Sequence, residues 1–83
     1  MRREEFKMER MNLVEVGEGY PVTEGKLPSA YYYTLGKAYA MSGNFEPANR
    51  IRSREGKVIE IEETPRGHYV TVEFDEDQTP LSL

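Results

Sequence analysis

The sequence predicts a small, mainly β domain whose centre is an antiparallel meander. Three short runs of alternating apolar and polar residues lie between Arg50 and Asp75, and two Gly-bearing turns separate them. Tyr (six) and Phe (three), which favour strands, are the only aromatic residues among the 83 of the chain. A chain of this length forms one small domain with a modest core. We therefore expect the meander to be the heart of the fold, with the rest of the chain covering its apolar face.

The first turn of the meander fixes how its first two strands pair. The stretch before Gly56 suits a type I turn followed by a left-handed glycine in a bulge. This loop length pairs Ile51 with Ile59 and Arg50 with Glu60. The expected strands of the meander cover residues 50–53, 57–63 and 68–75.

The second turn must contain an even number of residues if the apolar faces are to match. A four-residue loop beginning at Pro65 keeps this residue, which has no N–H, out of the ladder. It pairs Ile61 with Val72 and Ile59 with Phe74. One apolar face then carries Ile51, Ile59, Ile61, Val70, Val72 and Phe74. The opposite, polar face carries Arg50, Arg52, Val58, Glu60, Glu62, Tyr69, Thr71 and Glu73.

The rest of the chain frames this centre. Residues 1–11 are almost all charged, and we interpret them as a frayed helix or a disordered lead-in. A single β domain then covers 12–75, with a strand over 12–16 and a Gly- and Pro-rich loop over 17–28. Residues 76–83 read as a flexible acidic tail.

The Tyr-rich segment 29–42 fits two structures. Its spacing is compatible with a short helix that has an apolar stripe, and this is the structure we favour. In the strand alternative, Tyr31, Tyr33 and Leu35 share one face and the chain turns near Gly36.

The motif Ser53–Ile61, with Gly56 ahead of alternating apolar residues, resembles the KOW-type pattern of small SH3-like barrels. The hairpin that ends in Val70–Asp75 completes the likeness, which covers about a third of the chain. The resemblance implies binding to proteins, RNA or ribosomal surfaces, and rarely catalysis. It also implies that the meander curls into a small, partly open barrel. We expect no cofactor.

Composition narrows the function classes. The net charge of −4 disfavours indiscriminate nucleic-acid binding, and no apolar run approaches the ~20 residues of a membrane span. The absence of cysteine excludes thiolate catalysis and disulfides, and it fits a cytoplasmic protein. The basic start of the chain lacks the apolar stretch of a secretory signal.

An arginine stripe, made of Arg50, Arg52 and Arg54, is the clearest candidate for binding, because a guanidinium is suited to phosphate or carboxylate. The structural alternative is that Arg50 and Arg52 pair with Glu60 and Glu62 across the strands. Consecutive tyrosines cannot all face a core, so at least one is expected at the surface. The candidate partner-binding residues are Arg50, Arg52, Arg54, Lys57, Arg66, Tyr32 and Tyr69.

No residue pattern predicts catalysis or a metal site. His68 is the only histidine, and at a hairpin end it is interpreted as a solvated turn residue. The acidic run Glu73, Asp75, Glu76 and Asp77 lacks the spacing of a calcium loop and is interpreted as a solvated strand end. We therefore expect a non-enzymatic adaptor that binds another protein; the alternative is an RNA- or ribosome-associated accessory protein.

Overall fold

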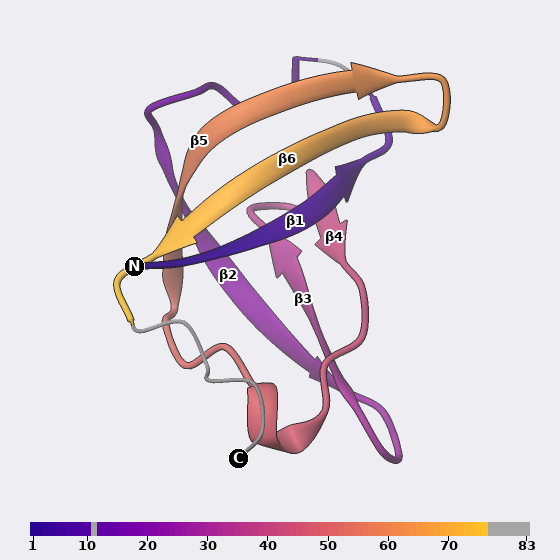
Figure 1. The fold of residues 1–83 in the computed structure, drawn as a ribbon, viewed down its shortest axis with the longest axis vertical. Coiled ribbons are helices and arrows are strands. Elements are labelled where there is room, and N and C mark those ends of the chain that lie inside the picture. The colour runs from indigo at the N-terminus through magenta and orange to yellow at the C-terminus, as the bar shows by residue number, and fades with distance from the viewer. Residues whose placement is uncertain (11, 77–83) are drawn as a thin grey trace.

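The computed structural model describes residues 1–10 and 12–76, which form a closed six-stranded barrel (Figure 1). All neighbouring strands are antiparallel, in the order β1-β4-β3-β2-β5-β6. This confirms the mainly β class and the meander, although the barrel is closed where the sequence predicts a partly open one. The architecture is compatible with an SH3-like or an OB-like barrel. The elements are β1 (Arg2–Met8), β2 (Gly19–Lys26), β3 (Tyr31–Leu35), β4 (Ala40–Ser42), the 3-10 turn η1 (Pro47–Asn49), β5 (Glu55–Thr64) and β6 (Gly67–Phe74).

The core is built mainly from the inward-facing residues of β1, β3, β5 and β6. Successive side chains of a strand point to opposite faces, so every second residue enters the barrel. In β6 this alternation buries Val70, Val72 and Phe74. The buried hydrophobic residues are Phe6, Met8, Val14, Tyr33, Leu35, Ala40, Ile51, Val58, Val70, Val72 and Phe74.

Strand β1 replaces the frayed or disordered lead-in that the sequence predicts for residues 1–11. It pairs with β6 over its whole length and with β4 at its end, and so it closes the barrel. Its inward-facing positions begin with Arg2 and Glu4 before Phe6 and Met8, and the two charges hide the alternation in the sequence. The expected acidic tail begins at Glu76, which contacts the barrel; residues 77–83 lie outside the described residues.

The strand that flanks β5 is β2, and not the segment 50–53 that the sequence predicts. β2 comes from the stretch 17–28, expected to be a loop, whereas 12–16 forms turns and bends instead of a strand. Pro21 is tolerated in β2 because it precedes the first β2–β3 pair, Val22–Leu35, so its missing N–H removes no bond from that ladder. Its carbonyl accepts a hydrogen bond from the Gly36 N–H. The predicted pairs Ile51–Ile59 and Arg50–Glu60 are therefore wrong.

The β5–β6 hairpin turns through two residues, Pro65 and Arg66, and not through a four-residue loop. Thr64 pairs with Gly67, whose φ of 137° is one that glycine adopts without strain. Pro65 stands in the turn itself, where its missing N–H removes no ladder bond. Because the turn starts at Pro65, the proline does not occupy a paired ladder position, and the longer loop is not needed.

A bulge at Ile59 changes which residues of β5 face the core. The register slips just after Val58, which pairs with Val72 and is fully buried, although the sequence places it on the polar face. Ile61 pairs with Val70 and not with Val72, and it stays 37% exposed. Ile59 is half-buried. The predicted apolar face is confirmed as core at Ile51, Val70, Val72 and Phe74.

The Tyr-rich segment forms strands β3 and β4, so the helix we favoured is wrong and the strand alternative is confirmed. Tyr33 and Leu35 are buried, and Tyr31 is half-buried. The chain turns at Gly36, where φ is 59°. The ring of Tyr39 lies so close that a Cβ at this glycine would come within 2.4 Å of it, so no larger residue fits.

Candidate functional site

The segment 50–54 runs between η1 and β5 and forms one wall of a groove of about 570 Å³. Residues of β2 form the opposite wall, and the site brings together three of the predicted binding residues. We call it the arginine groove. Its lining residues are Val22, Glu24, Tyr33, Pro47, Arg50, Ile51, Arg52, Ser53 and Arg54.

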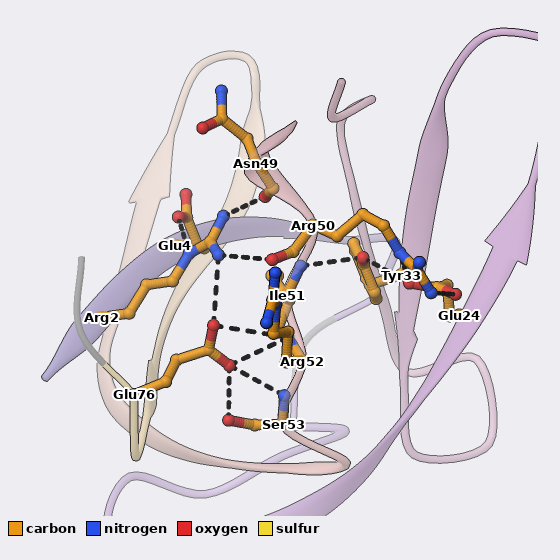
Figure 2. Close-up of polar contacts among 10 residues, drawn as sticks. All are labelled: Arg2, Glu4, Glu24, Tyr33, Asn49, Arg50, Ile51, Arg52, Ser53 and Glu76. Carbon is orange, nitrogen blue, oxygen red and sulfur yellow. Dashed lines mark hydrogen bonds and ion pairs between the residues drawn. The ribbon is translucent and has the colours of Figure 1, made fainter. Parts of the chain in front are cut away.

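A buried arginine fixes one end of this segment. The Arg2 side chain is 2% exposed, and its Nη1 donates to the carbonyl of Arg50 at 2.8 Å while its Nη2 donates to the carbonyl of Asn49 (Figure 2). Its Nε donates to Glu4 at 2.7 Å, and the guanidinium lies 5.6 Å from the ring centre of Phe45. Hydrogen bonds from Arg2 therefore fix the start of the segment 50–54 to β1, the first strand of the barrel.

Glu76 fixes the middle of the segment. Its Oε1 accepts hydrogen bonds from the Ser53 N–H at 2.8 Å, the Ser53 hydroxyl at 2.6 Å and the Arg52 N–H at 3.0 Å (Figure 2). Burial raises the pKa of Glu76, but the hydrogen bonds from Ser53, Arg52 and Arg2 outweigh burial and hold the pKa below its ordinary value. A charged Glu76 thus neutralises Arg2 and orders residues 52 and 53.

Arg50 lies across the groove and binds Glu24 of β2 through two hydrogen bonds, Nη2 to Oε1 at 2.7 Å and Nε to Oε2 at 3.0 Å. Its guanidinium stacks on the ring of Tyr31 at 4.4 Å. Hydrogen bonding to Arg50, with a further bond from Tyr33, lowers the pKa of Glu24. Arg50 therefore has an internal partner, but it is Glu24 and not the predicted Glu60.

Tyr33 of β3 forms hydrogen bonds to both walls of the groove, to Glu24 of β2 and to Ile51 of the segment 50–54. Its hydroxyl donates to Oε2 of Glu24 at 2.7 Å and accepts from the N–H of Ile51 at 2.9 Å. Burial, and then the bond to Glu24, raise the pKa of the Tyr33 phenol, so it stays a neutral donor. The groove consequently has a rigid, hydrogen-bonded floor.

Arg52 and Arg54 differ from Arg50. Both residues are exposed, and neither guanidinium makes a hydrogen bond or an ion pair with any residue in 1–10 or 12–76. The predicted partner of Arg52, Glu62, lies on β5 opposite Tyr69. The groove therefore presents two uncompensated cations on a backbone that other residues hold in place.

The remaining predicted binding residues lie elsewhere. Lys57 lines a separate depression of about 290 Å³ together with Glu55, Glu73 and Asp75. Arg66 and Tyr69 line a third, of about 370 Å³, with Glu5 and Glu62 at the β5–β6 hairpin. The ring of Tyr32 lies over Gly25 on the neighbouring strand. The seven residues thus divide among four places, and only the arginine stripe forms a group.

Sequence reasoning missed four residues that build the groove: Arg2, Glu24, Tyr33 and Glu76. Arg2 lies in the segment expected to be a frayed helix or a disordered lead-in, Glu76 in the expected flexible tail, and Glu24 in an expected loop. The period-2 pattern that starts at Arg2 was the one available signal for β1. For Glu76 the sequence carries none, because its partners, Arg2, Arg52 and Ser53, lie 23 to 74 residues away in the chain.

No metal-binding cluster is found in the described ranges, where no three His, Asp or Glu residues gather closely enough to hold an ion. His68 has Glu63 as a neighbour, 3.7 Å from Nδ1 to Oε2. Within the expected acidic strand end, Glu73 binds Arg3 and Glu76 is partly buried, so these two are not freely solvated. Asp77 lies outside the described residues.

Comparisons with protein-family models, with curated proteins and with solved structures found no match. The KOW-type resemblance therefore remains a prediction. No helix in the described part of the chain is long and apolar enough to cross a membrane.

Proposed function

We propose that the protein is a non-enzymatic binding module that takes an acidic segment of a partner protein into the arginine groove. The observation that supports this most is the pair of exposed, uncompensated guanidinium groups at Arg52 and Arg54 on a fixed backbone. A guanidinium offers parallel N–H donors that match a carboxylate or phosphate. Because Arg2 and Glu76 already order the segment, binding loses little backbone entropy.

A protein partner fits the groove better than RNA. Single-stranded RNA is held by open aromatic faces combined with a basic track. Here one face of Tyr31 is covered by Arg50, Tyr33 is buried, and the carboxylate of Glu24 lies inside the groove. The net charge of −4 further weakens long-range attraction of a polyanion. RNA binding is the outcome that the experiment below must exclude.

We also propose that the protein is related to small SH3-like barrels, through the KOW-type pattern of residues 53–61. The closed six-stranded barrel supports the likeness in fold, and the binding role is what this likeness implies. We also infer that the protein acts in the cytoplasm, which its lack of cysteine supports.

The test is affinity capture from the native cell with three immobilised forms of the full chain. These are the wild type, the double variant Arg52→Glu/Arg54→Glu, and the control Arg66→Glu, which reverses an exposed charge far from the groove. We expect one stoichiometric protein on the wild type and the control, lost from the double variant and unaffected by nuclease.

Two results would contradict the proposal. Equal capture by the double variant would show that the groove is not the binding surface. Recovery of ribosomal proteins that nuclease treatment removes would instead support the RNA-associated alternative.

A further inference from the structure

Strand β2 has an open edge beside the arginine groove. It pairs with β3 from Val22 to Lys26, but with β5 only from Gly19 to Pro21. The last backbone link on the β5 side runs from the N–H of Val22 to the carbonyl of Arg54, at 2.8 Å. Beyond this point β2 continues without a neighbouring strand on that side.

The unpaired backbone groups of this edge point away from β3, to the side of β2 on which the segment 50–54 lies. In an antiparallel ladder, alternate residues direct both their N–H and their C=O toward opposite neighbours. The backbone N–H of Val22 points to the segment 50–54, so the backbone groups of Glu24 and Lys26 point to the same side. The backbone groups of Thr23 and Gly25 point to β3. The backbone groups of Glu24 and Lys26 have no hydrogen-bond partner among the described residues.

The charges around this edge select its occupant. Arg52 and Arg54 stand across the groove, and Lys26 adds a third cation on β2 itself. The one carboxylate on the edge, that of Glu24, is already bound by Arg50. An extended basic segment is repelled here, and an extended acidic one is attracted.

We propose that the partner's acidic segment binds as an added strand, pairing its main chain with Glu24 and Lys26 and directing alternate acidic side chains to Arg52 and Arg54. This rests on the function proposed above and specifies how the same groove holds its occupant. Main-chain pairing supplies affinity, and the arginines supply the preference for acidic residues. The Arg50–Glu24 pair spans the groove, and Arg50 is 46% exposed, so the entering strand displaces the Arg50 side chain toward solvent.

Amide hydrogen exchange tests this with an internal control. The probe is a terminally blocked octapeptide that alternates glutamate with threonine, added at saturation to the full chain. We expect exchange at the Glu24 and Lys26 amides to slow by about tenfold or more, the effect of one gained hydrogen bond each. The amides of Thr23 and Gly25 already bond to β3 and are expected to stay unchanged.

A pair of modified peptides separates strand addition from simple charge attraction. N-methylation of every glutamate amide, or of every threonine amide, blocks one or the other edge of the peptide and leaves its charge unchanged. We expect one isomer to bind like the parent and the other to lose about tenfold in affinity.

The outcomes distinguish this inference from the proposed function. Binding of the parent and both isomers alike, without protection of Glu24 and Lys26, would overturn strand addition while the acidic-segment function stands. No binding of the parent peptide would overturn both.

Discussion

Arg2 and Glu76, which are 74 residues apart in the chain, meet 3.3 Å apart between Nη1 and Oε2. Their side chains are 2% and 18% exposed. Between them they bind the backbone of Asn49, Arg50, Arg52 and Ser53. The binding wall of the groove is thus held by a charge pair from the two ends of the barrel sequence.

Replacing Arg2 by alanine is expected to destabilise the protein by about 3 kcal/mol. The substitution removes the donor of the Asn49 and Arg50 carbonyls and the cation that pairs with Glu4 and Glu76. Urea unfolding measures this. The matched control is Arg3→Ala, whose exposed side chain pairs with Glu73 and is worth at most about 1 kcal/mol. Equal, small effects of both substitutions would contradict the structural role of Arg2.

Glu76 makes stability depend on acidity. Its pKa is lowered in the folded state, so its hydrogen bonds stabilise the fold fully above its ordinary value of 4.5 and are lost as the pH falls through the folded pKa. We expect Glu76→Gln to lower the free energy of unfolding at pH 7, and the deficit to shrink below pH 4.5. A deficit that stays constant down to pH 3 would show that the charge of Glu76 plays no part.

The Tyr33 hydroxyl is expected to contribute about 1–3 kcal/mol, because Tyr33→Phe leaves the buried Ile51 N–H without an acceptor. Tyr32→Phe is the control, since the Tyr32 hydroxyl has no hydrogen-bond partner within the described residues. Chemical denaturation of both variants gives the comparison. If the two differ by less than about 0.5 kcal/mol, the floor of the groove is not held as described.

Gly56 must lack a side chain because β6 packs directly on it. A Cβ there would lie 2.4 Å from Cγ1 of Val72 and 2.7 Å from Cε1 of Phe74. We expect Gly56→Ala to cost about 1–3 kcal/mol in thermal or urea unfolding. Gly43→Ala, with no atom within 4 Å of the new Cβ, should change stability by less than about 0.5 kcal/mol. A neutral Gly56→Ala would mean that β5 and β6 are not this close.

The sequence predicts the β class and the β5–β6 hairpin well, because alternation over Val70, Val72 and Phe74 is a local signal. It does not predict the register, since a bulge at Ile59 and a turn started by Pro65 leave no unique mark. The sequence pattern also does not predict the strands β1 and β2. Charged residues occupy inward positions of the former, and Gly and Pro interrupt the latter.

The sequence predicts the arginines of the site but not their partners. The grouping of Arg50, Arg52 and Arg54 follows from their spacing in an extended segment. Their partners do not, because Glu24 and Glu76 reach them only through the closure of the barrel. The predicted ion pairs with Glu60 and Glu62 assumed that the arginine segment is a strand of the meander. In the structure β2 takes that place, and Arg52 and Arg54 have no acidic partner within residues 1–10 and 12–76.

The central claim is that Arg52 and Arg54 hold an acidic protein segment. The most direct measurement is the dissociation constant of the glutamate–threonine octapeptide for the wild type, for Arg52→Glu/Arg54→Glu and for Arg66→Glu, with circular dichroism to confirm that each is folded. We predict a loss of about tenfold or more for the double variant and no change for Arg66→Glu. Equal affinities for all three proteins, or equal losses for both variants, would contradict the account.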